Sequence, residues 1–190
     1  MISGKIASLI EQPLAPVVKR VSVSPNVITI AGFLITAGGA FAIAFDLRAG
    51  GLIIMAGALF DGLDGMVARA NGKATRFGAY LDSVLDRYAD AFIFFGVAYY
   101  LRTNVIGVLL AMGTLAGAFL ISYARARAEG LGVQCKVGVM ERPERLVFII
   151  VGALTGYMIP VLCAMFFATH FTVAQRIIHT RKMLAERGQE

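Results

Sequence analysis

Long uncharged hydrophobic runs alternate with short polar connections along most of this 190-residue chain. The clearest runs cover residues 27–45, 104–124 and 146–175. A helix needs about 20 apolar residues to cross the hydrocarbon core of a bilayer, and the third run is long enough for two short crossings. Together with two weaker runs between residues 51 and 101, the pattern predicts six membrane-spanning helices. Their predicted ranges are about 26–46, 51–70, 77–101, 104–124, 141–157 and 160–187.

The first 21 residues have a different pattern, in which hydrophobic and charged side chains are interspersed and two prolines interrupt the segment. This pattern predicts an amphipathic helix that lies in the membrane interface. The segment has neither an uninterrupted apolar core nor a small-residue cleavage site, so we do not expect a signal peptide. The predicted fold class is an all-α integral membrane protein with one domain over residues 1–190. It combines an interfacial helix at 1–21 with a bundle of six transmembrane helices at 26–185.

The composition and the distribution of charge support a membrane protein with one basic side. Hydrophobic residues make up 58% of the chain and charged residues 16%, against about 25% charged residues in a typical soluble domain. The net charge of +6 is explained better by loops beside anionic lipid headgroups than by nucleic-acid binding. Of the 18 Lys and Arg residues, only Arg48 and Arg102 fall in connections on the second side, and Arg87 lies within a span. This asymmetry predicts that both termini and the basic connections face the cytoplasm.

Four carboxylates interrupt the hydrophobic pattern at Asp61, Asp64, Asp82 and Asp86. Ionisable groups at membrane depth are costly and usually have a chemical role. Spacings of three and four residues place each pair on one helix face, and a short connection should bring the two pairs together at the cytoplasmic boundary. Four such anions would repel one another unless cations bind them. Hard carboxylate oxygens favour Mg²⁺, Mn²⁺ or Ca²⁺, so the pattern predicts a metal site.

The residues around these acids predict what the metals hold. Gly65 and Gly78 leave space for close approach of a ligand, and Arg69 and Thr75 offer a guanidinium and a hydroxyl. Two divalent cations with these groups suit a pyrophosphate. We therefore expect a site for a nucleotide diphosphate or a lipid pyrophosphate.

The same stretch resembles the complete signature of the CDP-alcohol phosphotransferase family, D-x2-D-G-x2-A-R-x8-G-x3-D-x3-D, here running from Asp61 to Asp86. The resemblance implies two Mg²⁺ or Mn²⁺ ions per active site. One ion would be bound by Asp61, Asp64 and Asp82, and the other by Asp61, Asp82 and Asp86. It further implies that Asp86 is the general base towards an acceptor hydroxyl and that CMP is released.

The resemblance also implies a binding site for the CDP-lipid donor, which would be CDP-diacylglycerol or an archaeal CDP-ether lipid. The residues expected to line it are Pro25, Asn26, Val27, Gly65, Ala68, Arg69, Thr75 and Gly78.

A second basic region predicts the acceptor. Arginines are concentrated at the cytoplasmic ends of the last three spans, and guanidinium groups bind phosphate well, so the acceptor should be phosphorylated. The residues expected to bind its phosphate are Ser122, Arg125, Arg142, Arg145 and Arg176. The alternative interpretation of these arginines is an ordinary basic loop.

Within the family, the segments ISYARARAE, ERPERL and QRIIHTR resemble the branch that makes phosphatidylinositol phosphate or its archaeal ether-lipid counterpart. The resemblance implies inositol 1-phosphate as the acceptor, although Arg125 stands where a lysine is more usual. The alternative acceptor is glycerol 3-phosphate, as in a phosphatidylglycerophosphate synthase.

Other hypotheses stay open at this point. Acids within membrane helices also line ion pathways, which makes a divalent-cation transporter the alternative of another class. The family resemblance suggests a homodimer. Asp90 continues the four-residue spacing of Asp82 and Asp86, and we expect it to pair with Arg87 or to be a polar packing group.

Overall fold

The structure, a computed structural model, describes residues 24–70 and 75–188, with the side chains at 63–65 and 68–70 left out of the description. The predicted interfacial helix at 1–21 therefore lies outside the described residues. The described chain is all-helical. Its elements are α2 (Pro25–Ile43), α3 (Leu47–Ala70), α4 (Arg76–Tyr100), α5 (Val105–Gly130), α6 (Arg142–Thr155) and α7 (Met158–Ala185).

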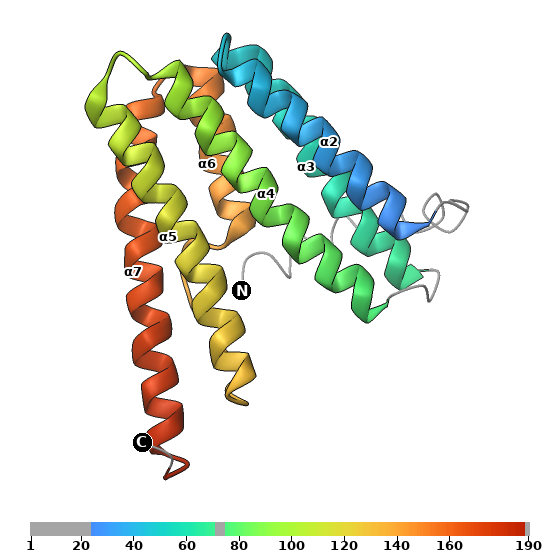
Figure 1. Cartoon of the computed structure of the whole chain (residues 1–190), viewed down its shortest axis with the longest axis vertical. Coiled ribbons are helices and arrows are strands. Elements are labelled where there is room, and N and C mark those ends of the chain that lie inside the picture. The colour runs from blue at the N-terminus through green and yellow to red at the C-terminus, as the bar shows by residue number, and fades with distance from the viewer. Residues whose placement is uncertain (1–23, 71–74, 189–190) are drawn as a thin grey trace.

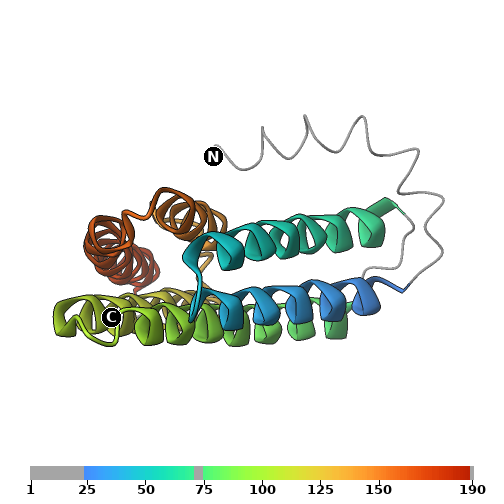
Figure 2. The same cartoon turned by 90° about the horizontal axis from the view of Figure 1, so that it is seen from above.

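The six helices run alternately between two ends of the molecule, and their principal contacts form a closed ring (Figure 1). The ring order is α2, α3, α6, α7, α5, α4 and back to α2. Seen from above, the ring is flattened into one layer of α2, α4 and α5 and a second layer of α3, α6 and α7 (Figure 2). The start of α4 and the ends of α5 and α7 lie at the lower end in Figure 1. In the ring order given above, α4 and α6 are opposite each other.

Several helix boundaries differ from the predicted ones because local capping groups decide them. The Asp46 carboxylate accepts hydrogen bonds from the N–H groups of Arg48 (2.8 Å) and Ala49 (3.1 Å), so α3 begins at Leu47 and not at 51. Such a carboxylate at a helix start satisfies N–H groups that have no partner within the helix. Gly156 ends α6 with a φ of 82°, a left-handed conformation that favours glycine.

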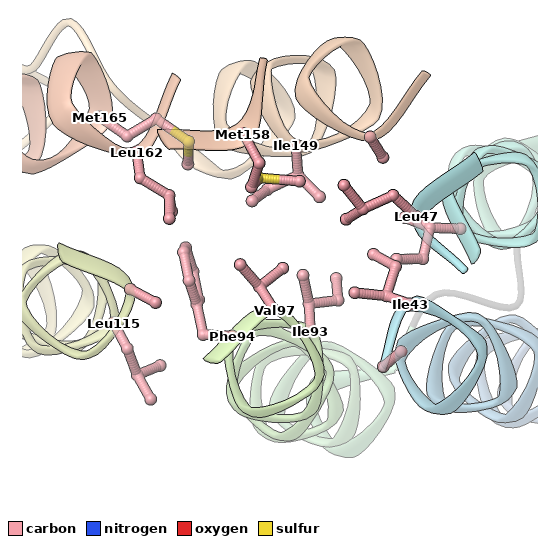
Figure 3. Close-up of a cluster of buried hydrophobic side chains, with 14 of the residues drawn as sticks. Ile43, Leu47, Ile93, Phe94, Val97, Leu115, Ile149, Met158, Leu162 and Met165 are labelled. Atoms are coloured by element: carbon pink, nitrogen blue, oxygen red, sulfur yellow. The ribbon is translucent and has the colours of Figure 1, made fainter. Parts of the chain in front are cut away.

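The centre of the ring is apolar over its upper part (Figure 3). Every helix of the ring borders this core, and α4 projects the largest side chain into it. Its labelled members are Ile43, Leu47, Ile93, Phe94, Val97, Leu115, Ile149, Met158, Leu162 and Met165. Because lipid tails are as apolar as these side chains, the core stabilises a membrane bundle mainly through close van der Waals packing. Going towards the lower end, the helix turn before Phe94 carries Asp90, so the centre of the ring changes from apolar to charged at this level.

Close contact between α2 and α4 depends on Gly96. A Cβ atom at this position would lie 2.1 Å from the backbone oxygen of Ala40, so the two helices approach more closely than any larger residue allows. Small residues permit this kind of approach between membrane helices. The contact fixes the position of α4, which carries the acids.

Three of the described helices, α2, α5 and α7, are long and apolar enough to cross a membrane. Their composition indicates a membrane protein. The other three are not among the described helices that are long and apolar enough, because α3 and α4 carry the acids and α6 has only 14 residues. Their membrane crossing therefore stays a prediction.

Replacing Gly96 by Ala should destabilise the protein by about 1–3 kcal/mol, because the added methyl group overpacks the contact with Ala40. Gly38→Ala is the matched control, since a Cβ atom there meets nothing within 4 Å. Thermal unfolding in detergent should show a lower Tm for Gly96→Ala and an unchanged or higher Tm for Gly38→Ala. Equal Tm values for the two variants would contradict the role of Gly96.

Candidate active site

Three of the four predicted metal-binding carboxylates converge at the lower end of the ring. Asp61 comes from α3, and Asp82 and Asp86 come from successive turns of α4. One carboxylate oxygen from each lies within 4.8 Å of the other two, and all three residues are partly buried. The Asp64 side chain lies outside the described residues. The three that meet are the set that the family resemblance assigns to one of the two ions.

The described acids meet as the short connection between α3 and α4 predicted, although the two helices make few contacts with each other. Both α3 and α4 pack mainly against α2, which holds them apart over most of their length. The four-residue spacing of Asp82 and Asp86 keeps both on the face of α4 that points towards α3. Three hard oxygen donors at this separation suit a divalent cation such as Mg²⁺ or Mn²⁺.

Arg142, the first residue of α6, reaches the same acids. Its Nη1 atom forms ion pairs with Asp61 and with Asp86, the latter at 2.7 Å. Pro143 in the first turn favours the start of the helix at this point. The guanidinium offsets the repulsion among carboxylates that are shielded from water.

A polar cavity of about 220 Å³ adjoins the acids. Binding pockets for drug-sized ligands usually measure about 300–1,000 Å³, so this cavity suits a smaller molecule. All five residues predicted to bind the acceptor phosphate line it. The full lining is Ser83, Asp86, Arg87, Asp90, Ile121, Ser122, Arg125, Glu141, Arg142, Pro143, Arg145 and Arg176.

The expected pairing of Asp90 with Arg87 is wrong. Asp90 pairs instead with Arg145, at 2.6 Å between Oδ2 and Nη2, and both residues are buried. Arg87 points towards Asp86, at 3.8 Å. The spacing of four residues from Asp86 indicated only that Asp90 shares a face of α4 with the predicted metal-binding acids, and it did not indicate Arg145 as the partner.

Arg176 holds three separate segments together. Its Nη1 atom donates to the carbonyl oxygen of Ile121 (2.6 Å), its Nε atom to the carbonyl oxygen of Val137 (2.9 Å), and its Nη2 atom to the carboxylate of Glu141 (3.0 Å). The Thr172 hydroxyl, one turn earlier on α7, accepts hydrogen bonds from the N–H groups at 139 and 140. These contacts fix the chain that leads into α6, so Arg176 shapes the cavity as well as lining it.

Five of the residues predicted to bind the donor lie near the starts of α2 and α4. The Thr75 hydroxyl accepts a hydrogen bond from Gly78 N–H (2.9 Å) and keeps its own proton to donate. A Cβ atom at Gly78 would lie 3.0 Å from the side-chain oxygen of Asn26, so this glycine lets the two helix starts approach. Pro25 and Val27 flank Asn26. The side chains at Gly65, Ala68 and Arg69 lie outside the described residues.

Comparison with known proteins gives this arrangement a family. Residues 22–180 match the CDP-alcohol phosphatidyltransferase family, so the chain belongs to that family of transferases. It is 35% identical to an archaetidylinositol phosphate synthase of Methanothermobacter thermautotrophicus, over 93% of this chain and 92% of that protein. It is also 35% identical to a phosphatidylinositol phosphate synthase of Mycobacteroides abscessus, over 93% and 86%.

Solved structures show the same likeness. A crystal structure of Mycobacterium tuberculosis phosphatidylinositol phosphate synthase with CDP-DAG bound matches with a TM-score of 0.80 and 32% identity, covering 90% of this chain and 93% of that one. A structure of the same enzyme in complex with manganese and citrate matches with a TM-score of 0.75 and 31% identity, covering 90% and 88%.

Replacing Asp82 by Asn should weaken Mn²⁺ binding at least tenfold, because even changes to residues behind metal ligands cost about 10–100-fold in affinity. The purified protein can be titrated with Mn²⁺ and the free ion measured by electron paramagnetic resonance. Asp46→Asn, which alters a carboxylate at the opposite end of α3, is the matched control and should leave the affinity unchanged. An unchanged affinity in Asp82→Asn would remove this residue from the metal site.

Proposed function

We propose that this protein transfers the phosphatidyl or archaetidyl group of a CDP-linked lipid to inositol 1-phosphate and releases CMP. One observation carries the proposal: Asp86 belongs both to the carboxylate cluster and to the lining of the arginine cavity. A donor pyrophosphate held at the acids and a phosphorylated acceptor held by the arginines would therefore meet at this side chain.

The donor side of the reaction is supported by the chemistry of the residues present. Asp61, Asp64, Asp82 and Asp86 would hold two divalent cations, and Gly65, Arg69 and Thr75 would contact the CDP group. When bound, Mg²⁺ or Mn²⁺ neutralises charge on the pyrophosphate and on the departing CMP. The tuberculosis enzyme has been solved with CDP-DAG and, separately, with manganese, which agrees with this assignment.

The transfer itself needs one proton acceptor and accurate positioning. The acceptor hydroxyl oxygen would form a bond to the lipid-bearing phosphorus, the bond from that phosphorus to the CMP oxygen would break, and the hydroxyl proton would pass to the Asp86 carboxylate. A carboxylate is a weak base for an alcohol, since the pKa of a free aspartate is about 3.9. Positioning of the two substrates must therefore supply much of the rate enhancement.

The acceptor assignment is supported by the arginine cavity together with the names of the relatives. Arg142, Arg145 and Arg176, with Ser122 and Arg125 at the rim, offer several phosphate-binding donors in a cavity suited to a small molecule. The relatives in M. thermautotrophicus and M. abscessus are synthases of inositol phosphate lipids. Glycerol 3-phosphate also carries a phosphate and is the second candidate.

The transporter hypothesis is not supported. Membership of a transferase family argues against it, and Asp61, Asp82, Asp86 and Asp90 lie on one side of the apolar core instead of following an ion path through it.

We further propose that the protein is a single domain in the cytoplasmic membrane, with six crossings and with both termini and the active site facing the cytoplasm. The alternating helix directions support this topology, because the start of α4 and the ends of α5 and α7, where many of the Lys and Arg residues lie, share one end. The family match over residues 22–180 supports one domain. A homodimer is proposed from the family resemblance alone.

The function can be tested by supplying purified protein with CDP-diacylglycerol, Mg²⁺ and one candidate acceptor at a time, and by measuring CMP. We expect CMP release with inositol 1-phosphate and little with glycerol 3-phosphate. The reverse preference would replace the acceptor, and CMP release with neither would contradict the proposed function.

Asp86→Asn should reduce CMP release by at least about a hundredfold, the usual contribution of a general base. At saturating Mn²⁺, binding of the CDP-lipid should be largely retained, because Asp61, Asp64 and Asp82 would still hold one cation; retention of radiolabelled donor measures it. Asp46→Asn should keep full activity. Full activity of Asp86→Asn would exclude this residue as the base.

A further inference from the structure

Asp90 is a buried carboxylate for which neither the donor site nor the chemical step has a use. It lies one turn beyond Asp86 on α4 and is only 4% exposed. Asp82, Asp86 and Asp90 therefore form a row on one face of this helix, and the third member lies next to the apolar core. Asp90 is absent from the set of carboxylates that could share a metal ion.

The two oxygen atoms of Asp90 face two different arginines. Oδ2 lies 2.6 Å from Nη2 of Arg145, and Oδ1 lies 3.9 Å from Nε of Arg142. These arginines are three residues apart in the first turn of α6, where two like charges would otherwise repel each other. A single carboxylate lies between them, hydrogen-bonded to Arg145 and at ion-pair distance from Arg142, whose Nη1 atom also pairs with Asp61 and Asp86.

Both arginines keep hydrogen-bonding capacity for a ligand. Each guanidinium system has five N–H donors. The Nε atoms of Arg142 and Arg145 are buried and make no hydrogen bond within the described part of the chain. Both residues line the cavity, so an anionic oxygen bound there would lie beside guanidinium groups that face Asp90.

We propose that Asp90 is a positioning residue that holds Arg142 and Arg145 at the spacing required to bind the acceptor phosphate. The inference rests on the proposed function, because it assumes that this cavity takes a phosphorylated acceptor. It differs from a purely structural role, in which Asp90 would only neutralise the buried charge of Arg145.

The first test is Asp90→Asn, which keeps the size of the side chain and removes its charge. We expect the KM for inositol 1-phosphate to rise about tenfold or more. The KM for CDP-diacylglycerol and the Mn²⁺ affinity should stay within about twofold of the wild-type values, since none of the described donor-site residues pairs directly with Asp90. Asp46→Asn is the matched control and should leave all three values unchanged.

Asp90→Asn leaves the buried charge of Arg145 without its carboxylate partner and should also lower the Tm, so Asp90→Glu provides the second test. It retains the charge that neutralises Arg145 and displaces the carboxylate by one methylene group. If Asp90 positions the arginines, this variant also raises the acceptor KM. If Asp90 only balances charge, the acceptor KM of Asp90→Glu equals that of the wild type, and this result would overturn the inference.

The wild-type assay separates failure of this inference from failure of the proposed function. If the wild-type protein transfers the lipid group to no phosphorylated polyol, the proposed function and the positioning role of Asp90 are both contradicted before any variant is measured. If it does transfer, unchanged acceptor KM values in Asp90→Asn and Asp90→Glu overturn the positioning role alone.

Discussion

The structure depends on the pairing of carboxylates from α4 with guanidinium groups from α6. These two helices face each other across the ring and make their principal contacts with other neighbours. Over the upper part of the ring they are joined through apolar side chains, with Phe94 and Ile149 in the same core. At the lower end Asp86 and Asp90 meet Arg142 and Arg145 instead. A charge left unpaired in such surroundings is costly, so the ring has to hold both helices in register.

The chain between α5 and α6 supports this pairing from outside the ring. Thr172 and Arg176 of α7 bind the backbone just before α6, and Glu141 at the helix start is itself an ion-pair partner of Arg176. The arginines that face the acids are therefore placed by two helices, because α6 carries them and α7 fixes where α6 begins. Glu141 and Arg176 therefore both line the cavity beside the acids and hold its wall in place.

Much of this arrangement follows from local pattern, and the rest needs three-dimensional contacts. Uninterrupted apolar runs predicted the helices well, and the spacing of Asp82 and Asp86 predicted their shared face. The start of α3 was missed because a single carboxylate, Asp46, extends the helix backwards by one turn. The partner of Asp90 was missed for a different reason: Arg145 is 55 residues away, and no local spacing connects the two.

If α6 crosses the membrane as proposed, its shortness would set the depth at which the chemistry takes place. Its 14 residues extend about 21 Å, less than the roughly 30 Å of a hydrocarbon core. In the proposed membrane arrangement, a helix that starts so far inside leaves Arg142 below the headgroup plane. A polar recess would then descend from the cytoplasm to meet a lipid whose tails stay in the bilayer. The water-soluble substrate would travel down to the lipid, and the lipid would have no need to leave the membrane.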